Sequence, residues 1–404
     1  MTLVEDSLVD PLQGFRSRFV LPEGVIYLDG NSLGALPAAT GPRLAEFVAT
    51  EWGRDLVGSW NAHGWIEAPQ RLGGKIAGLI GADPGEVICA DSTSVNLFKL
   101  LAAGCQSLPS RSKILTEPGN FPTDLYIAQG VAQFLPGRTV QTVAADALIG
   151  AIDEDTAVVL LTHVHYKTGR KLDMAGITAA AHAKGALVLW DLSHSVGAVP
   201  LDLNACNVDL AVGCGYKYLN GGPGAPAFLY VARYLQDQLN SPLSGWMGHG
   251  DPFGFVDDYH PAAGVGRFLC GTPSILAMAA LEVGVDLMLE ADVALLAEKA
   301  EALTEAFIAG MDKLCPDMEL ITPRRWSERG SHVAYAHADA WAVSQALIRR
   351  GVVGDFRAPD AIRFGFAPLY ISLSDVGRAV EIIAEVLDSK AWDAPEFRSR
   401  NRVT

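Results

Sequence analysis

Short, largely apolar segments alternate with helical segments in the middle of the chain. Residues 156–164 (TAVVLLTHV), 186–190 (ALVLW), 208–212 and 227–231 are rich in β-branched and aliphatic residues, which is typical of buried strands. The Ala-rich segment 173–184 lies between the first two and has the character of a helix. This order predicts an α/β fold with a doubly wound, mainly parallel sheet covered by helices on both faces.

The pattern changes toward the C-terminus. A long helical pattern covers residues 274–314, and we expect it to break near Gly284 or at 290–292. After Pro316 shorter strands and helices alternate, which predicts a small α+β unit. Its elements are expected at 333–336, 340–350, 361–366 and 374–388.

The domain organisation follows from these changes of pattern. The N-terminal stretch to about residue 45 is rich in Gly and Pro, and the chain contains no internal repeat. We expect a large α/β domain at 46–285 and a small domain that combines residues 1–45 with residues 286–404.

Composition excludes several classes of protein. The chain has 404 residues, of which 50% are apolar and 19% charged, and its net charge is −15. Such a chain folds, and its negative charge makes it a poor partner for nucleic acid or an anionic membrane. The longest apolar run, 275–281, is far shorter than the roughly 20 residues that span a bilayer.

The cysteines and the N-terminus indicate a cytoplasmic chain. Six cysteines lie at positions 89, 105, 206, 214, 270 and 315, without a C-x-x-C pair. Several fall in apolar runs, which favours free buried thiols over a disulfide framework. Glu5, Asp6 and Asp10 stand where a signal peptide would be basic and then apolar, so we expect no export signal. No cluster has the spacing of a metal site, and none is expected.

A carboxylate and a lysine follow two successive predicted strands. Asp191 ends the run at 186–190, and Lys217 follows the run at 208–212. Because ligands bind outside the carboxyl ends of strands in open α/β sheets, both side chains are expected at one rim, with His194 nearby. Pyridoxal 5′-phosphate (PLP) needs a lysine for its Schiff base and an acid for its ring nitrogen. Taken singly, Asp191 is also typical of a helix cap and Lys217 of a solvated loop.

The segments around this pair favour the same cofactor. The Gly-rich stretch 215–224 lets the chain turn tightly near a ligand. Thr93 and Ser94 follow a short strand and precede a helix, a place suited to a phosphate and equally to simple capping. Phe121 and Asp124 offer an aromatic ring and a second carboxylate, although a Pro turn with a buried Phe explains this segment too.

Longer stretches resemble one known family. They are FPTDLYIA (121–128), LTHVHYKTG (161–169), WDLSHSVGAVP (190–200), YKYLNGGPG (216–224) and PLSGWMGH (242–249). The chain resembles kynureninase over nearly its whole length, from residues 26–34 to 364–370. The resemblance implies the aspartate aminotransferase fold of PLP-dependent enzymes, with a seven-stranded type of sheet. The 121–124 segment and the Lys-Tyr context distinguish this family from the cysteine desulfurases of the same fold group.

The resemblance also implies how PLP is held. Lys217 forms the Schiff base, Asp191 pairs with the ring nitrogen with Asp124 close by, and Tyr216 joins Lys217 and Asp191 in catalysis. The full implied cofactor site is Thr93, Ser94, Phe121, Thr123, Asp124, Thr162, Asp191, His194, Tyr216, Lys217, Trp246 and Thr272. Thr272 is expected to reach the cofactor phosphate of a neighbouring subunit, so a homodimer with shared active sites is implied.

For the substrate, the resemblance implies hydrolytic cleavage of the Cβ–Cγ bond of L-kynurenine to anthranilate and L-alanine. Arg363 is expected to bind the α-carboxylate, since a guanidinium donates two parallel hydrogen bonds to such a group. Trp60, Gly271 and Thr272 align with the aryl pocket and resemble the bacterial type, for which 3-hydroxykynurenine is the poorer substrate. The role in tryptophan catabolism, in NAD biosynthesis or in supplying anthranilate stays open.

Three other classes of protein fit the sequence less well. A cysteine desulfurase or an aminotransferase shares the fold, but a desulfurase needs a reactive cysteine on a mobile loop, and Cys315 is the only loop-like candidate. A dinucleotide-binding oxidoreductase is disfavoured because no G-x-G-x-x-G follows a strand. A PLP-binding scaffold without catalysis is disfavoured because every expected catalytic position is filled.

Overall fold

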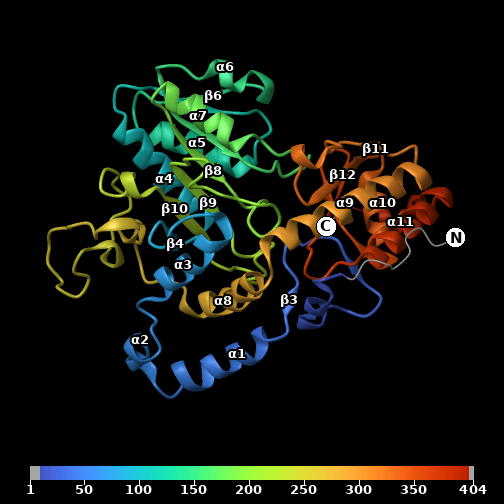
Figure 1. Ribbon diagram of the computed structural model, residues 1–404, viewed down its shortest axis with the longest axis horizontal. Coiled ribbons are helices and arrows are strands. Elements are labelled where there is room, and N and C mark those ends of the chain that lie inside the picture. Colours follow the sequence, from blue (N-terminus) through green and yellow to red (C-terminus); the bar gives the residue numbers. More distant parts are fainter. Residues whose placement is uncertain (1–9, 400–404) are drawn as a thin grey trace.

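The computed structural model describes residues 10–399 and contains two main sheets, each with its own helices (Figure 1). Residues 1–9 and 400–404 lie outside the described residues, and with them Glu5 and Asp6, on which the expectation of no export signal depends. The larger sheet lies in the middle of the chain and the smaller one is built from its C-terminal part.

The larger sheet has seven strands, and six of them run in the same direction. Their order is β4 (Val87–Cys89), β10 (Phe228–Val231), β9 (Leu210–Gly213), β8 (Leu187–Asp191), β7 (Thr156–Thr162), β5 (Lys113–Thr116) and β6 (Thr139–Thr142). The mainly parallel sheet is thus confirmed. β10 is the exception, because it pairs antiparallel with both neighbours. A parallel crossover usually needs a helix, and the connection from β9 to β10 contains none.

Helices pack on this sheet as the sequence pattern predicts. They are α3 (Ala68–Ile80), α4 (Thr93–Ser107), α5 (Pro122–Phe134), α6 (Leu148–Ala151), α7 (Met174–Ala183) and α8 (Ile275–Glu290). The strands β7, β9 and β10 are buried along their whole length, which explains why they lack an alternating pattern. Two shorter helices, α1 (Thr40–Glu46) and α2 (Ser59–Ala62), precede this part of the chain and lie below it in Figure 1.

The smaller sheet has four antiparallel strands in the order β11 (Glu319–Leu320), β12 (His332–Ala336), β15 (Ala361–Gly365) and β14 (Asp355–Arg357). The helices α9 (Val293–Leu314), α10 (Ala340–Arg349) and α11 (Leu373–Asp388) accompany it, and α9 packs against α11. The four elements expected after Pro316 are confirmed to within two residues.

The long helical pattern breaks at Ala291 and Asp292, between α8 and α9. This is one of the two positions at which we expected the break. Asp292 caps α9 by accepting a hydrogen bond from the backbone N–H of Ala294 at 2.8 Å. Gly284 lies inside α8 and does not break it. A Cβ at Gly284 would come within 2.1 Å of the carbonyl oxygen of Leu219, so this glycine allows a close helix approach.

The N-terminal segment pairs with strands from the C-terminal part of the chain, which also forms the smaller sheet. Strand β2 (Ile26–Tyr27) pairs in parallel with β13 (Val352–Val353), and Asp29 bridges to Gly365. A second short pair joins β1 (Phe19–Val20) to β3 (Leu36–Pro37). These contacts agree with a small domain that contains residues from both ends of the chain, while the boundaries at 45/46 and 285/286 stay a prediction.

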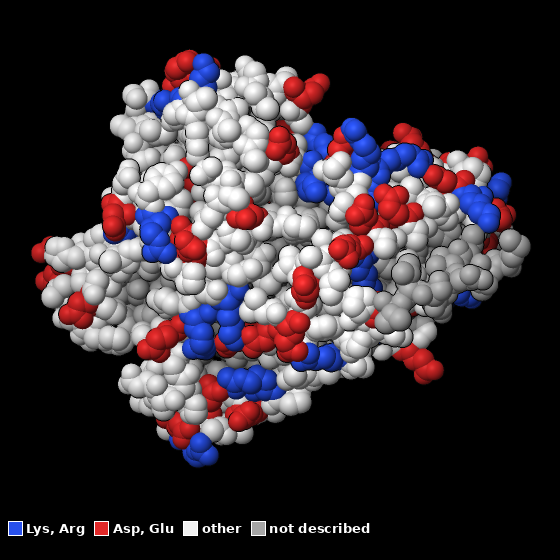
Figure 2. Space-filling model, in the orientation of Figure 1, with Lys and Arg blue, Asp and Glu red and all other residues white. Residues whose placement is uncertain are grey.

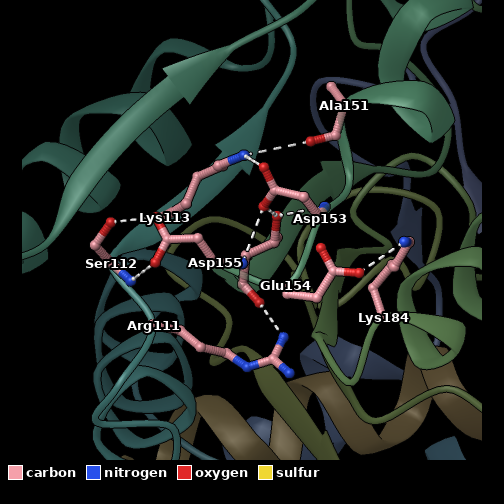
Figure 3. Close-up of polar contacts among 9 residues, drawn as sticks. Arg111, Ser112, Lys113, Ala151, Asp153, Glu154, Asp155 and Lys184 are labelled. Carbon is pink, nitrogen blue, oxygen red and sulfur yellow. Dashed lines mark hydrogen bonds and ion pairs between the residues drawn. The ribbon is translucent and has the colours of Figure 1, made fainter.

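The amino ends of the central strands are closed by the protein's own polar contacts (Figure 3). Lys113 Nζ, at the start of β5, lies 2.6 Å from Asp153 Oδ2. The backbone N–H of Ser112 donates to Asp155 Oδ1 at 2.8 Å, which ties β5 to the turn before β7. These contacts connect residues at the amino ends of β5 and β7, whereas ligands in open α/β folds bind at the carboxyl ends of the strands.

Positive and negative side chains are interspersed over the face in Figure 2, so the net charge of −15 forms no single acidic field there. Ion pairs such as Lys75 with Asp286, at 2.6 Å, and Arg71 with Glu282, at 3.0 Å, contribute to this mixture. A search of helices within residues 10–399 finds none that has both the length and the apolar character to cross a membrane.

Candidate active site

A cavity of about 260 Å³ lies where β7 and β8 end and where the chain leaves β9. Its volume is slightly below the usual range of ligand pockets, about 300–1,000 Å³, which suits a small molecule. All predicted cofactor residues except Trp246 and Thr272 line it. The lining residues are Ser92, Thr93, Ser94, Leu97, Phe121, Thr123, Asp124, Thr162, Tyr166, Asp191, Ser193, His194, Tyr216 and Lys217.

Lys217 lies in the loop after β9, and its side chain is buried. Its Nζ is 2.8 Å from Nε2 of His194. Burial, and secondly the positive charge of Lys217, hold the pKa of His194 well below its ordinary value, so the neutral ring accepts a hydrogen bond from the lysine. The ring centroids of Phe121 and Tyr216 lie 5.9 and 5.7 Å from Nζ. The amine is thus desolvated and held in place, which suits a nucleophilic lysine.

Two buried carboxyls lie close to Lys217. Asp124 is in the first turn of α5, and Asp191 is the last residue of β8. Burial raises the pKa of Asp124 well above its ordinary value, and the charge of Asp191 raises it further. Burial also raises the pKa of Asp191, but the backbone N–H of Ser193, which donates to Asp191 Oδ1 at 2.8 Å, stabilises its charged form. Both directions are upward, and the stronger rise at Asp124 together with the hydrogen bond at Asp191 favours the proton on Asp124 and the negative charge on Asp191.

The hydroxyl of Thr162 fixes the acid pair from the side of β7. Its Oγ1 lies 3.1 Å from Asp124 Oδ2 and donates to Asn120 Oδ1 at 2.6 Å. Asn120 in turn donates to Thr116 Oγ1 at 3.3 Å, so the network extends into β5. Asn120 was not predicted, although it directly precedes the predicted segment that starts at Phe121.

The first turn of α4 also contributes to the lining of the cavity. Ser92 caps this helix, because its Oγ accepts from the backbone N–H of Val95 at 3.4 Å. Thr93 and Ser94 then line the cavity with their hydroxyls beside the first N–H groups of the helix, which have no partner inside it. Burial raises the pKa of Tyr216 beyond its usual range, so its phenol keeps the proton and can donate to an anion.

Sequence reasoning missed Ser92, Leu97, Tyr166 and Ser193 among the lining residues. The Tyr166 ring packs edge-on against Phe121 with 5.3 Å between the ring centroids, so the two rings form one wall. The available signal was an aromatic residue a few positions after the end of β7. Ser92 was signalled by its place before two hydroxyl residues.

Arg363, the predicted carboxylate ligand, lies beside the cavity and not in its lining. It is 1% exposed and sits in β15, directly across from Asp355 of β14. Its Nε and Nη2 make two hydrogen bonds to the carboxylate of Asp355, at 2.8 and 2.6 Å. Nη2 also donates to Ser32 Oγ at 3.0 Å, and Nη1 donates to the carbonyl oxygen of Tyr166.

Four further predicted residues do not reach the cavity within this chain. Trp246 is 37% exposed and borders a separate surface cavity with residues 251–259. Gly271 and Thr272 are exposed in the loop before α8. Trp60 lies in α2, where its ring packs edge-on against Trp65 at 5.9 Å. Their predicted roles stay predictions, and they require either a partner subunit or a movement of these segments.

Metal ligation has no support in the part of the chain that the structure describes. Within residues 10–399, no three or more His, Cys, Asp or Glu side chains are grouped so that they could hold a metal ion. His163 and His165, which flank the site, have other partners: His163 Nδ1 lies 2.9 Å from Ser195 Oγ, and His165 Nε2 donates to the carbonyl of Gly119 at 2.7 Å.

Solved structures with the same architecture include a cysteine desulfurase and a C–S lyase that contains PLP. A cysteine desulfurase of Thermococcus onnurineus matches 95% of this chain and 99% of its own, with a TM-score of 0.79 and 21% identity. A mutant of the cystine C–S lyase C-DES, with glycine covalently linked to its PLP cofactor, covers 92% of this chain and 99% of its own, with a TM-score of 0.81 and 19% identity. At these identities the likeness shows the fold alone.

The fold is therefore that of PLP-dependent enzymes of the aspartate aminotransferase type, as predicted. The kynureninase of Pseudomonas fluorescens is 50% identical over 403 residues, which cover 98% of this chain and 97% of the relative. That of Burkholderia pseudomallei strain K96243 is 49% identical over the same share, and residues 296–383 match the kynureninase C-terminal domain. The chain belongs to the kynureninase family.

Proposed function

We propose that this chain is a PLP-dependent kynureninase, which cleaves L-kynurenine to anthranilate and L-alanine. The observation that carries this function is the cavity in which buried Lys217, neutral His194 and the acid pair Asp124 and Asp191 meet. It occurs in a chain that is 50% identical to a kynureninase over 98% of its length.

The residues present fit PLP. Asp124 Oδ1 and His194 Nδ1 are buried and have no hydrogen-bond partner within residues 10–399, so both residues can make a further hydrogen bond to a bound molecule. The lining combines two carboxyls, a lysine and a helix N-terminus, which are groups suited to a ring nitrogen, an aldehyde and a phosphate. When bound, PLP supplies an electron sink that stabilises negative charge at the substrate Cα.

The protein's own groups have distinct tasks in this proposal. Asp191 keeps its negative charge against the ring nitrogen, while the proton of Asp124 prevents two adjacent charges. Lys217, once released by the substrate amine, takes the proton from Cα, because its Nζ is the basic atom at the centre of the cavity. Tyr216 donates its phenolic hydrogen at the phosphate end and is placed to transfer a proton. Cleavage then needs water at the γ-carbonyl.

The environment of Cys315 disfavours it as the reactive cysteine of a desulfurase. Cys315, the loop-like candidate, is 5% exposed at the end of α9, and burial raises its pKa to about 11. A reactive thiol is exposed and has a lowered pKa, so Cys315 has the opposite environment. The desulfurases in the comparison are alike in fold, at 21% identity or less.

We further propose a cytoplasmic location and a role in tryptophan catabolism, with a link to NAD biosynthesis. All six cysteines are free, and four of them are buried, which suits a reducing compartment. The pathway role follows from the proposed substrate.

The direct test is anthranilate fluorescence after purified protein, PLP and L-kynurenine are mixed, with 3-hydroxykynurenine in parallel. We expect anthranilate and L-alanine in equal amounts, and a higher kcat/KM for L-kynurenine. This preference depends on the predicted place of Trp60 in the aryl pocket, where its indole would offer a single hydrogen-bond donor and its bulk would crowd a hydroxylated ring. Release of sulfide or of a keto acid in place of anthranilate would contradict the function. A preference for 3-hydroxykynurenine would contradict the assignment of the aryl pocket.

We also propose a homodimer in which each active site uses residues of both subunits. Trp246 and Thr272 do not line the cavity of their own chain, and both are exposed. The loop after Trp246 exposes Phe253 and Phe255, which are 57% and 79% exposed. Such a cluster of apolar side chains is typical of an interface.

Subunit mixing tests this arrangement. Lys217→Ala and the double variant Trp246→Ala, Thr272→Ala are each expected to be inactive alone. If sites are shared, a heterodimer of the two contains one intact site, and random mixing restores up to about a quarter of the native activity. No recovery, with heterodimers shown to form by tagged copurification, would contradict shared sites.

A further inference from the structure

A cluster of opposite charges joins the N-terminal segment to the smaller sheet beside the cavity. Asp355 and Arg357 lie on the same face of β14, and Arg363 lies opposite Asp355 on β15. Ser32, from the N-terminal segment, donates its hydroxyl to Asp355 Oδ2 at 2.9 Å. Two guanidiniums therefore share one carboxylate, because Nη2 of Arg357 and Nη2 of Arg363 each lie 2.6 Å from Asp355 Oδ2.

The guanidinium of Arg363 is almost fully used within the protein. Of its five N–H groups, those on Nε and Nη2 are directed to Asp355 and Ser32, and Nη1 donates to the carbonyl of Tyr166. One hydrogen on Nη1 is left for a ligand. A single hydrogen cannot make the two parallel bonds with which an arginine usually holds a carboxylate.

Fewer of the N–H groups of Arg357 have a hydrogen-bond partner. Among the described residues, its ion pair with Asp355 and its 3.3 Å hydrogen bond to Ser32 both involve Nη2. Its Nε is buried without a hydrogen-bond partner in residues 10–399, and its side chain is 36% exposed. Burying an unpaired donor on a cation is costly, so a further acceptor is needed here.

The charge of Arg357 reaches the cavity. Burial raises the pKa of Tyr216, and the positive charge of Arg357 opposes that rise. Burial lowers the pKa of His194, and the charges of Lys217, Arg363 and Arg357 add to the effect. Arg357 does not line the cavity itself. Its neighbour Arg363 donates to the carbonyl oxygen of Tyr166, which lines the cavity together with Tyr216 and His194, so the charge cluster lies next to a molecule bound there.

The cluster has a surplus of positive charge. Asp29 is the other nearby carboxyl, and burial followed by the charge of Asp355 raises its pKa to about 7. Below that pH Asp29 is neutral, and two guanidiniums face the single charge of Asp355. An incoming carboxylate would balance this surplus.

We infer that Arg357 is a second ligand of the substrate α-carboxylate, and that Asp355 positions both guanidiniums for it. This inference rests on the proposed function, since it concerns how the same site holds L-kynurenine. Arg363 then contributes mainly through charge and its one remaining donor, while Arg357 supplies donors on Nε and Nη1 that have no partner among the described residues.

The test compares Arg357→Gln with the native protein below pH 7. We expect KM for L-kynurenine to rise by about 10–100-fold, the range for losing hydrogen bonds to a charged group, with kcat within about 3-fold. Calorimetric titration of the holoenzyme with the deaminated analogue of kynurenine, which keeps the carboxylate, should show the same loss of affinity. Kynuramine, which lacks the carboxylate, should bind both proteins within about 2-fold.

Two further variants keep the test decisive. Arg357→Lys retains the charge and should recover part of the lost affinity. This variant also provides the test if the glutamine variant does not fold. Arg378→Gln is the matched control, because Arg378 is 59% exposed and pairs with Glu381 on the surface. An unchanged KM in Arg357→Gln, or an equal loss of affinity for kynuramine, would overturn the inference. If the native protein released no anthranilate, the proposed function itself would fail instead.

Discussion

Lys217→Ala is expected to lower the turnover of L-kynurenine by at least about 10³-fold, because it removes both the covalent attachment of PLP and the base for the Cα proton. The environment of Nζ supports this size of effect. The side chain is buried, and its Nζ lies 2.8 Å from His194 Nε2. Other described lysines, such as Lys171 in the segment between β7 and α7, do not line the cavity and cannot replace Lys217. Single-turnover anthranilate release measures the loss.

The controls separate chemistry from folding. Lys217→Arg keeps a positive charge but cannot form the Schiff base, so it should be as inactive as the alanine variant. Lys184→Ala should retain full activity, because Lys184 is 43% exposed and pairs with Glu154 on the surface. The visible absorption of lysine-bound PLP should disappear in both Lys217 variants and persist in Lys184→Ala. Substantial multiple turnover by Lys217→Ala would refute the assignment.

The larger sheet could be predicted because burial on both faces leaves a simple pattern in the sequence. The expected run at 186–190 is β8, shifted by one residue so that Asp191 becomes its last member. The direction of β10 could not be read in the same way. A buried strand looks alike whether it runs parallel or antiparallel, and only the helix-free connection from β9 distinguishes the two.

The site shows a similar division. Asp191 and Lys217 were predictable as neighbours because strand ends meet at one rim of a parallel sheet. The hydrogen-bond partner of Arg363 was not predictable. A buried arginine signals that an acceptor exists, but the choice of Asp355 depends on the register between β14 and β15, which the sequence pattern does not specify. Trp246 and Thr272 illustrate a different limit. In the proposed homodimer they would act in the partner's site, and such residues carry no mark in the pattern of their own chain.

The acid pair gives the second large expected effect. Asp191→Asn should lower kcat by about 10²–10³-fold, the usual loss when one charge that stabilises the reacting state is removed. Without a negative charge beside the ring nitrogen, PLP is a weaker electron sink. Asp124→Asn should cost about 10-fold or less, because burial and the charge of Asp191 already keep Asp124 protonated. Asparagine is similarly neutral and can still donate a hydrogen bond.

The two variants form a matched pair, since each replaces one buried carboxyl with an amide of the same size. Steady-state anthranilate release gives kcat, and the absorption of bound PLP reports whether the cofactor is retained. Burial alone would make the two substitutions equally harmful, because both side chains are at most 3% exposed. A large difference in kcat therefore measures where the single negative charge lies. Equal losses in both variants would show that the proton is not held by Asp124, and the assignment of Asp191 as the acid at the ring nitrogen would fall with it.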